Sequence, residues 1–188
     1  MSRRRSLTSL RAWAPALGVA AAIVAVTLGA SIASTAVRSA SAPVVGIEGV
    51  ATIDPPDGWT EDPDARRDED GAVRFVLAKG SASVVITVVP DAGVDPPTLA
   101  AAYERRVLQA RLLELAKTDP QPATVGGIPA VRTIYVGTTA SRADVEGFVT
   151  VAVGPGGEGL VIDGVAPEGL LASVVRDLEA MADGARIG

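Results

Sequence analysis

An uncharged stretch of 26 residues runs from Ala12 to Val37, between Arg11 and Arg38. A helix needs about 20 apolar residues to cross the core of a bilayer. Residues 12–37 therefore have the length and composition of a membrane-spanning helix. Arginines precede the stretch, and since positive charge is retained on the cytoplasmic side, we expect a cytoplasmic N-terminus and a C-terminal domain on the outer face.

A cleaved signal peptide is the alternative reading of the same residues. Signal peptides have an apolar core of about 7–15 residues and a cleavage site with small residues. The sequence SASA at Ser39–Ala42 offers such a site, but Pro43 follows it and the apolar stretch is long. We therefore favour an uncleaved single-span anchor in the cell membrane, with secretion after cleavage as the alternative.

This interpretation divides the chain into four segments. The expected segments are a basic cytoplasmic segment (1–11), a transmembrane helix or signal anchor (12–37), a linker (38–47) and an extracytoplasmic domain (48–188). The lipid bilayer is then a predicted partner, through residues 12–37.

The composition excludes several classes of chemistry. The chain has no cysteine and no histidine, so thiol nucleophiles, disulfides, imidazole bases and nearly all zinc or haem sites are ruled out. From residue 43 onward, 12 basic residues stand against 22 acidic ones, a net charge of −10. A phosphate backbone would be repelled by such a domain, so we expect no nucleic-acid binding.

Apolar periodicity predicts both strands and helices in the outer domain. Two strands that are joined at Lys79-Gly80 predict a hairpin, and the second is apolar on both faces, as in a central strand. An Asp95-Pro96-Pro97-Thr98 sequence predicts a helix start, because it places a capping carboxylate before prolines. The predicted strands are a short one before Pro55-Pro56, then Ala72–Ala78, Ala82–Val89, Ile128–Val136, Val145–Val153 and Leu160–Ala166, and the predicted helices are Leu99–Lys117 and a segment from Pro167 to Gly184.

These elements predict an α+β fold. In the first helix, Leu99, Tyr103, Val107 and Ala110 form an apolar stripe, with Arg111 largely off it. Neither a helix nor a sheet can bury its apolar face alone. We therefore expect an antiparallel β-sheet covered by two helices.

The order of elements and two short motifs resemble a known family. The motifs are PPDGW after the first strand and VGGIPAVRTIY at Val125–Tyr135. The chain resembles the PsbP-like α/β/α sandwich, and in style the exported actinobacterial proteins of the LpqN/LpqT kind, over about residues 48–184. LpqN-like proteins carry a lipidated cysteine, which is absent here. The family includes photosystem extrinsic subunits and a binder of a nuclear-transport GTPase, so the resemblance implies a non-catalytic binding or accessory module.

The acidic stretch from Pro55 to Val73 is the best candidate for a metal site, with seven carboxylates in 19 residues. With Gly71 at the glycine position of an EF-hand loop, Arg66 and Leu77 fall on ligand positions that need acids. The match fails, so a solvated hairpin edge is the better interpretation. We predict no metal site and no cofactor.

No catalytic residues emerge from the remaining candidates. We expect Trp59 to plug the core, Tyr103 and Tyr135 to lie in the core or at its rim, and the glycine-rich segment 154–159 to be a turn. Glu146 and Asp163 could face one another as an acid–base pair, but strand alternation directs Glu146 to solvent. We therefore predict a non-enzymatic, membrane-tethered accessory domain that binds another envelope protein. The alternative is a small-molecule or lipid carrier with its ligand between sheet and helix.

Overall fold

The computed structural model describes residues 44–69 and 71–188. The predicted span at residues 12–37 lies outside these residues. Among the residues that the structure describes, no helix is long and apolar enough to cross a membrane.

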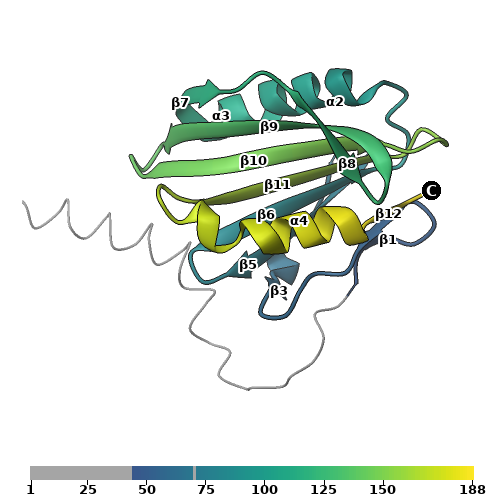
Figure 1. The fold of residues 1–188 in the computed structure, drawn as a ribbon, viewed down its shortest axis with the longest axis horizontal. Helices are drawn as coiled ribbons and strands as arrows, with labels where there is room; N and C mark the ends of the chain where they lie inside the picture. The colour runs from purple at the N-terminus through teal and green to yellow at the C-terminus, as the bar shows by residue number, and fades with distance from the viewer. Residues whose placement is uncertain (1–43, 70) are drawn as a thin grey trace, which may run out of the picture. The chain divides into compact units, whose positions relative to one another are not determined.

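The described elements follow one another along the chain as shown in Figure 1. In chain order they are β1 (Val45–Ile47), β2 (Ala51–Ile53), β3 (Thr60–Glu61), the 3-10 turn η3 (Pro63–Ala65), β4 (Arg67–Glu69), β5 (Ala72–Lys79), β6 (Ala82–Val89), α2 (Pro96–Tyr103), the π turn η4 (Glu104–Leu108), α3 (Gln109–Arg111), β7 (Leu112–Lys117), β8 (Gln121–Val125), β9 (Ile128–Thr139), β10 (Asp144–Val153), β11 (Gly159–Pro167), the 3-10 turn η5 (Leu171–Ser173), α4 (Val175–Gly184) and β12 (Arg186–Ile187).

Within this part of the chain, nine strands form one antiparallel sheet. Its order is β3-β5-β6-β11-β10-β9-β7, with β4 also beside β5 and β8 also beside β9. Strands β1, β2 and β12 form a separate small sheet. The predicted β5–β6 hairpin is confirmed, and β6 is central because it pairs with β5 on one side and β11 on the other.

The two faces of the large sheet carry separate apolar cores. Alternation along each strand sends neighbouring side chains to opposite faces. Helix α4 covers one face and contacts β8 and β11, while α2 covers the other over β9, β10 and β11. In Figure 1, α4 lies in front of the sheet and α2 and α3 lie behind it. The expected α+β sandwich is therefore the observed fold.

The start of α2 forms as predicted. The Asp95 side chain accepts a hydrogen bond from Thr98 N–H at 2.8 Å, and prolines occupy the first helical positions. Hydrogen bonding to the Thr98 side chain, and then to its backbone N–H, lowers the pKa of Asp95. The cap satisfies a backbone donor that the first helical turn would otherwise leave without a partner.

The prediction of a single helix over Leu99–Lys117 was wrong. The α-helix continues as the π turn η4 and the short α3, and the chain then becomes strand β7 at Leu112. The residues of β7 favour a helix by intrinsic propensity, but pairing with β9 stabilises them as a strand.

Two other boundaries also differ from prediction. Pro167 was expected to open the last helix, but it ends β11, and α4 begins only at Val175. Strand β1 lies inside the segment expected to be a linker, where it pairs with β2. The folded part therefore starts earlier than residue 48.

Candidate functional site

A buried carboxylate lies at the centre of the α2 side of the sheet. Asp163 on β11 has no exposed surface. Its oxygens accept hydrogen bonds from the Tyr103 hydroxyl at 2.9 Å and from the Tyr135 hydroxyl at 2.7 Å. The Arg111 Nη2 atom lies 3.0 Å from Asp163 Oδ2 and also donates to the Tyr135 hydroxyl at 2.7 Å. We call these four residues the Asp163 cluster.

The cluster joins the neighbouring helices α2 and α3 to strands β9 and β11, which come later in the sequence. Tyr103 ends α2, Arg111 ends α3, and Tyr135 reaches from β9 across β10. A Cβ atom at Gly147 on β10 would lie 2.6 Å from the Tyr135 ring. Glycine at this position therefore makes room for the tyrosine to reach the carboxylate.

The environment keeps both tyrosines protonated. Burial and the nearby Asp163 carboxylate raise the pKa of Tyr103 and of Tyr135 well above 10. Burial alone would lower the pKa of Arg111, but the Asp163 carboxylate and the tyrosine hydroxyls outweigh this effect, so its pKa is raised. The cluster thus holds a cation and two hydrogen-bond donors around one carboxylate.

This arrangement is suited to fixing elements in place rather than to acid–base chemistry. Asp163 is closed to solvent, and tyrosines with raised pKa values are poor bases at neutral pH. Both tyrosines lie in the core, as predicted. Glu146 does not face Asp163, because it accepts a hydrogen bond from Leu171 N–H at 2.8 Å and lies on the α4 side. Arg111 was not predicted as a site residue, because we expected it to lie off the buried stripe.

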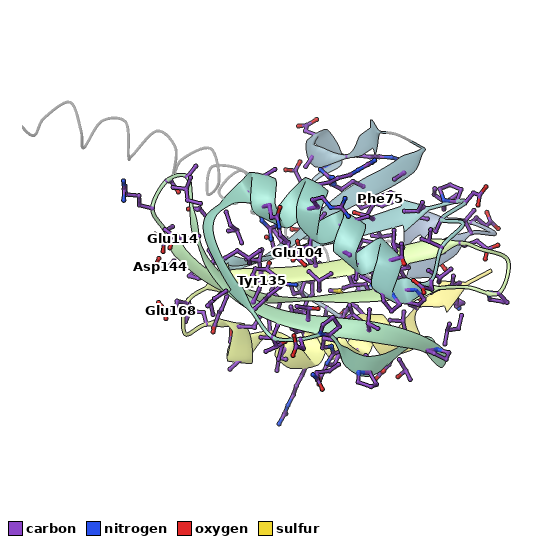
Figure 2. The ribbon with its side chains drawn as sticks, turned by 90° about the horizontal axis from the view of Figure 1, so that it is seen from above. Phe75, Glu104, Glu114, Tyr135, Asp144 and Glu168 are labelled. Atoms are coloured by element: carbon purple, nitrogen blue, oxygen red, sulfur yellow. The ribbon has the colours of Figure 1, made fainter. Side chains whose placement is uncertain are left out.

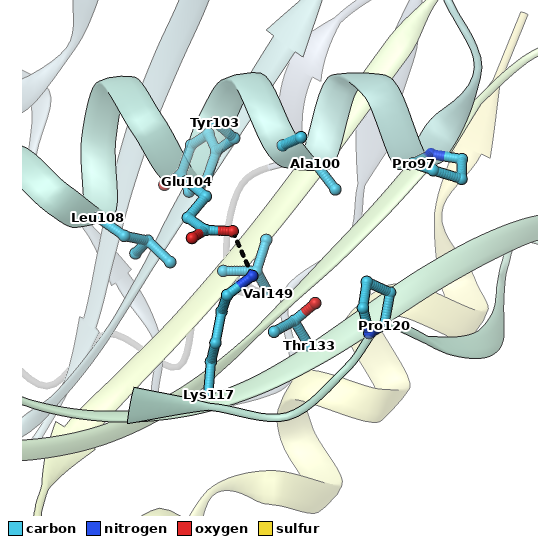
Figure 3. Close-up of a pocket in the computed structure, with 10 residues that line it drawn as sticks. Pro97, Ala100, Tyr103, Glu104, Leu108, Lys117, Pro120, Thr133 and Val149 are labelled. Carbon is cyan, nitrogen blue, oxygen red and sulfur yellow. Dashed lines mark hydrogen bonds and ion pairs between the residues drawn. The ribbon is translucent and has the colours of Figure 1, made fainter. Parts of the chain in front are cut away.

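A small cavity lies between α2 and the sheet, as Figure 3 shows. Its volume is about 80 Å³, and its lining includes Pro97, Ala100, Leu108 and Val149. Lys117 on β7 reaches across to Glu104 on the π turn, with Nζ 2.6 Å from Oε2. Ligand pockets for drug-sized molecules measure about 300–1,000 Å³, so this cavity has room for no more than a small apolar group.

Two exposed apolar side chains lie beside a groove, on the face of β9 that looks to the α4 side of the sheet. Ile134 and Val136 on β9 are 50% and 47% exposed, and Leu170, before η5, is 47% exposed. Beside them is a groove of about 340 Å³, lined by parts of β7, β9 and β10. We call the groove and the exposed side chains of Ile134 and Val136 the β7–β9 surface.

Three carboxylates border this surface. Glu114, Asp144 and Glu168 line the groove, and Figure 2 shows all three at the same end of the sheet. Asp144 accepts a hydrogen bond from the Thr138 hydroxyl at 2.9 Å. None of the three has an ion-pair partner among the residues that the structure describes. The surface therefore combines exposed apolar groups with negative charge.

The acidic stretch and Trp59 lie elsewhere. Strand β4 pairs with β5 near the opposite edge of the sheet, which confirms the hairpin edge; Asp70 lies outside the described residues. Among the side chains that the structure describes, which leave out those of residues 67–70, no group of three or more acidic side chains is placed to hold a metal ion. Trp59 is 2% exposed, as expected for a core residue, and its Nε1 donates to Asp177 Oδ2 at 2.9 Å.

Several solved structures of other proteins match the fold of this chain. The cyanobacterial PsbP (CyanoP) from Synechocystis sp. PCC 6803 matches with a TM-score of 0.56, over 84% of this chain and 99% of its own, at 10% identity. The fold is PsbP-like. LpqN of Mycobacterium tuberculosis, described as involved in cell envelope biogenesis, matches with a TM-score of 0.53, over 77% of this chain and 89% of its own, at 16% identity.

A third match to the PsbP-like domain comes from a eukaryote. The Ran-binding protein Mog1p of Saccharomyces cerevisiae matches with a TM-score of 0.50, over 77% of this chain and 94% of its own, at 14% identity. Neither the known protein-family models nor the curated protein sequences match this chain. At such low identities the structural matches show a shared fold, and the resemblance predicted from the sequence motifs is confirmed at that level.

Proposed function

We propose that this chain is a non-catalytic accessory domain of a bacterial envelope that binds another protein. The observation that carries the proposal is the β7–β9 surface, where Ile134 and Val136 are about half exposed beside a groove. An uncovered apolar surface with a polar rim is typical of protein-binding sites. LpqN and Mog1p, described respectively as involved in envelope biogenesis and as Ran-binding, support a binding role on the same fold.

We further propose that residues 12–37 tether the domain to the outer face of the membrane. The support is the uncharged stretch and the arginines before it. The intact mass of the protein extracted from membranes tests this placement. A mass that includes the first 42 residues supports the anchor, whereas a mass that begins after Ala42 supports secretion.

The carrier alternative has less physical support. The cavity between α2 and the sheet is about 80 Å³, and the Asp163 cluster occupies the neighbouring space with side chains that are already hydrogen-bonded to one another. An acyl chain or drug-sized ligand would have to separate α2 from the sheet.

Crosslinking in native membranes tests the binding function directly. The full-length chain is expressed in its source organism with a tag, crosslinked mildly and analysed by mass spectrometry. We expect one dominant envelope protein, which is lost in Val136→Asp because a charge then enters the apolar contact. Val94→Asp is the matched control, since Val94 is 40% exposed but lies before α2. Failure to recover any partner, or equal recovery with Val136→Asp, would contradict the proposal.

A further inference from the structure

Strand β7 has one edge without a partner strand in the described part of the chain. It is the last strand in the sheet order and pairs only with β9. Thr118 N–H donates to Ile134 O at 3.0 Å. Because backbone groups alternate along an antiparallel strand, the N–H and C=O groups of Ala116 also point toward β9. Those of Leu115 and Lys117 point away from the sheet and can receive another strand.

The sheet face beside this edge is apolar and accessible. Val136 pairs with Ala116 across the β7–β9 ladder, and its side chain is 47% exposed. The groove follows the same strands. A strand that is added to β7 would thus extend an existing apolar face, on which every second side chain of the added strand would lie.

The charges at this end of the sheet indicate which kind of segment can bind beside β7. Glu114, Asp144 and Glu168 lack cationic partners in the described residues, and the nearby Lys117 already pairs with Glu104. A second copy of this chain would bring the same three carboxylates to the contact, which would be repulsive. An extended segment with arginine or lysine side chains would neutralise them.

We propose, on the basis of the protein-binding function above, that the partner inserts an extended basic segment that adds a strand to the outer edge of β7. Its apolar side chains pack on the β7–β9 surface, and its basic side chains pair with Glu114, Asp144 and Glu168. The backbone hydrogen bonds of Leu115 and Lys117 hold the segment in register.

A synthetic peptide of alternating arginine and valine tests the chemistry on the full-length chain in detergent. We expect it to bind and to slow hydrogen exchange of the Leu115 and Lys117 amides. A peptide of alternating glutamate and valine should bind at least about tenfold more weakly. The double variant Glu114→Lys with Glu168→Lys should weaken binding of the arginine peptide by a similar factor. Equal binding of both peptides, or no binding of the arginine peptide, would overturn the proposal.

A proline substitution tests the strand addition separately. Leu115→Pro removes an outward N–H that the β7–β9 ladder does not use, while Leu115→Ala removes the same side-chain packing and keeps the N–H. We expect the peptide to bind the alanine variant and to bind the proline variant at least about tenfold more weakly. Circular dichroism establishes whether both variants fold. If the proline variant does not fold, slowed hydrogen exchange of the Leu115 and Lys117 amides in the peptide complex decides whether a strand is added, and unchanged exchange would reject it.

The same variants in native membranes separate this inference from the general binding function. A crosslinker at Leu113, which is 64% exposed at the edge of β7, should capture a basic peptide of the partner. A partner that is lost in Val136→Asp but retained in Leu115→Pro would leave the binding function intact and reject strand addition. Capture of a second copy of this chain would also reject it, and absence of any partner would reject the binding function itself.

Discussion

Helices α4 and α2 cover opposite faces of the same sheet, but they rest on side chains of different kinds. Under α4 the buried contacts are almost entirely apolar, with Leu178 lying over Gly164 and Met181 fully buried. Under α2 a charged group lies at the centre of the sheet, surrounded by two tyrosines and an arginine.

The difference concerns how each helix is held in position. Apolar packing is non-directional and tolerates small displacements, whereas a buried carboxylate requires its donors at defined distances. At the rim of the α4 side, Lys79 and Asp177 form an ion pair that solvent reaches, and the buried Trp59 donates to the same carboxylate. We therefore expect the α2 side to be the more sensitive to the loss of a single polar atom.

The largest expected effect comes from breaking the buried ion pair. Arg111→Met keeps the length and much of the apolar volume of the side chain but leaves the Asp163 carboxylate without its cation. We expect the free energy of unfolding to fall by about 3–5 kcal/mol, as measured by urea denaturation at neutral pH. The surface variant Arg105→Met is the control, and an equal loss in both would show that the pair does not matter.

On the other face, Leu178→Ala tests pure packing. Leu178 is fully buried and its side chain fills the space above Gly164. We expect the free energy of unfolding to fall by about 3 kcal/mol, because burial is lost and a cavity remains. This loss should be the same at every pH. A marked pH dependence of the loss would mean that the two faces are coupled through the sheet.

A smaller effect is expected from the tyrosine hydroxyls. Tyr135→Phe removes bonds to Asp163 and Arg111 and should cost about 1–3 kcal/mol at neutral pH. Because the pKa values of Tyr103 and Tyr135 are raised in the folded state, unfolded chains lose these protons first as the pH rises through about 10. Stability should therefore be intact below pH 10 and fall above it, by about 1.4 kcal/mol per pH unit for each tyrosine.

The chain contains only these two tyrosines, so tyrosinate absorbance reports on the Asp163 cluster alone. We expect no tyrosinate in the folded protein near pH 10 and about half the alkaline loss of stability in Tyr135→Phe. Ionisation of the folded wild type at the ordinary tyrosine pKa would contradict the closed cluster.

The smallest effect is expected at the rim of the α4 side. The hydrogen bond from Lys79 lowers the pKa of Asp177 despite its partial burial, and the Trp59 indole adds to the effect. The contribution is therefore present above pH 4 and is lost as the pH falls below it. Asp177→Asn should cost less than about 1 kcal/mol at neutral pH and should flatten the acid side of the stability profile, as followed by thermal unfolding.

The sequence predicted the parts of the fold that depend on local pattern. The β5–β6 hairpin, the Asp95 cap and the buried Trp59 follow from alternation, capping chemistry and turn residues that act within a few positions. Strand β7 was not predictable in this way, because its helix-favouring residues form a strand only when β9 is available to pair with them.

The candidate sites were harder to predict, for two physical reasons. The position of Arg111 depends on the π turn, in which Gln109 N–H donates to Glu104 O, five residues back. In a regular helix, residues 103 and 111 would be separated by about 80° around the axis, but the extra residue of the wide turn reduces this to about 20°. The β7–β9 surface, in turn, lies outside strands β8 and β11, on which α4 packs, and no local pattern records the reach of a helix across a sheet.

The same π turn has a consequence for the tolerance of this chain to changes in length. It contains one residue more than a regular helix needs to bring Tyr103 and Arg111 to the same side. A deletion of Arg105, which is exposed, would allow an unbroken α-helix with the two side chains seven positions apart, which is again the same face. The segment should therefore accept the loss of one residue but not the gain of another, which would rotate Arg111 away from the sheet.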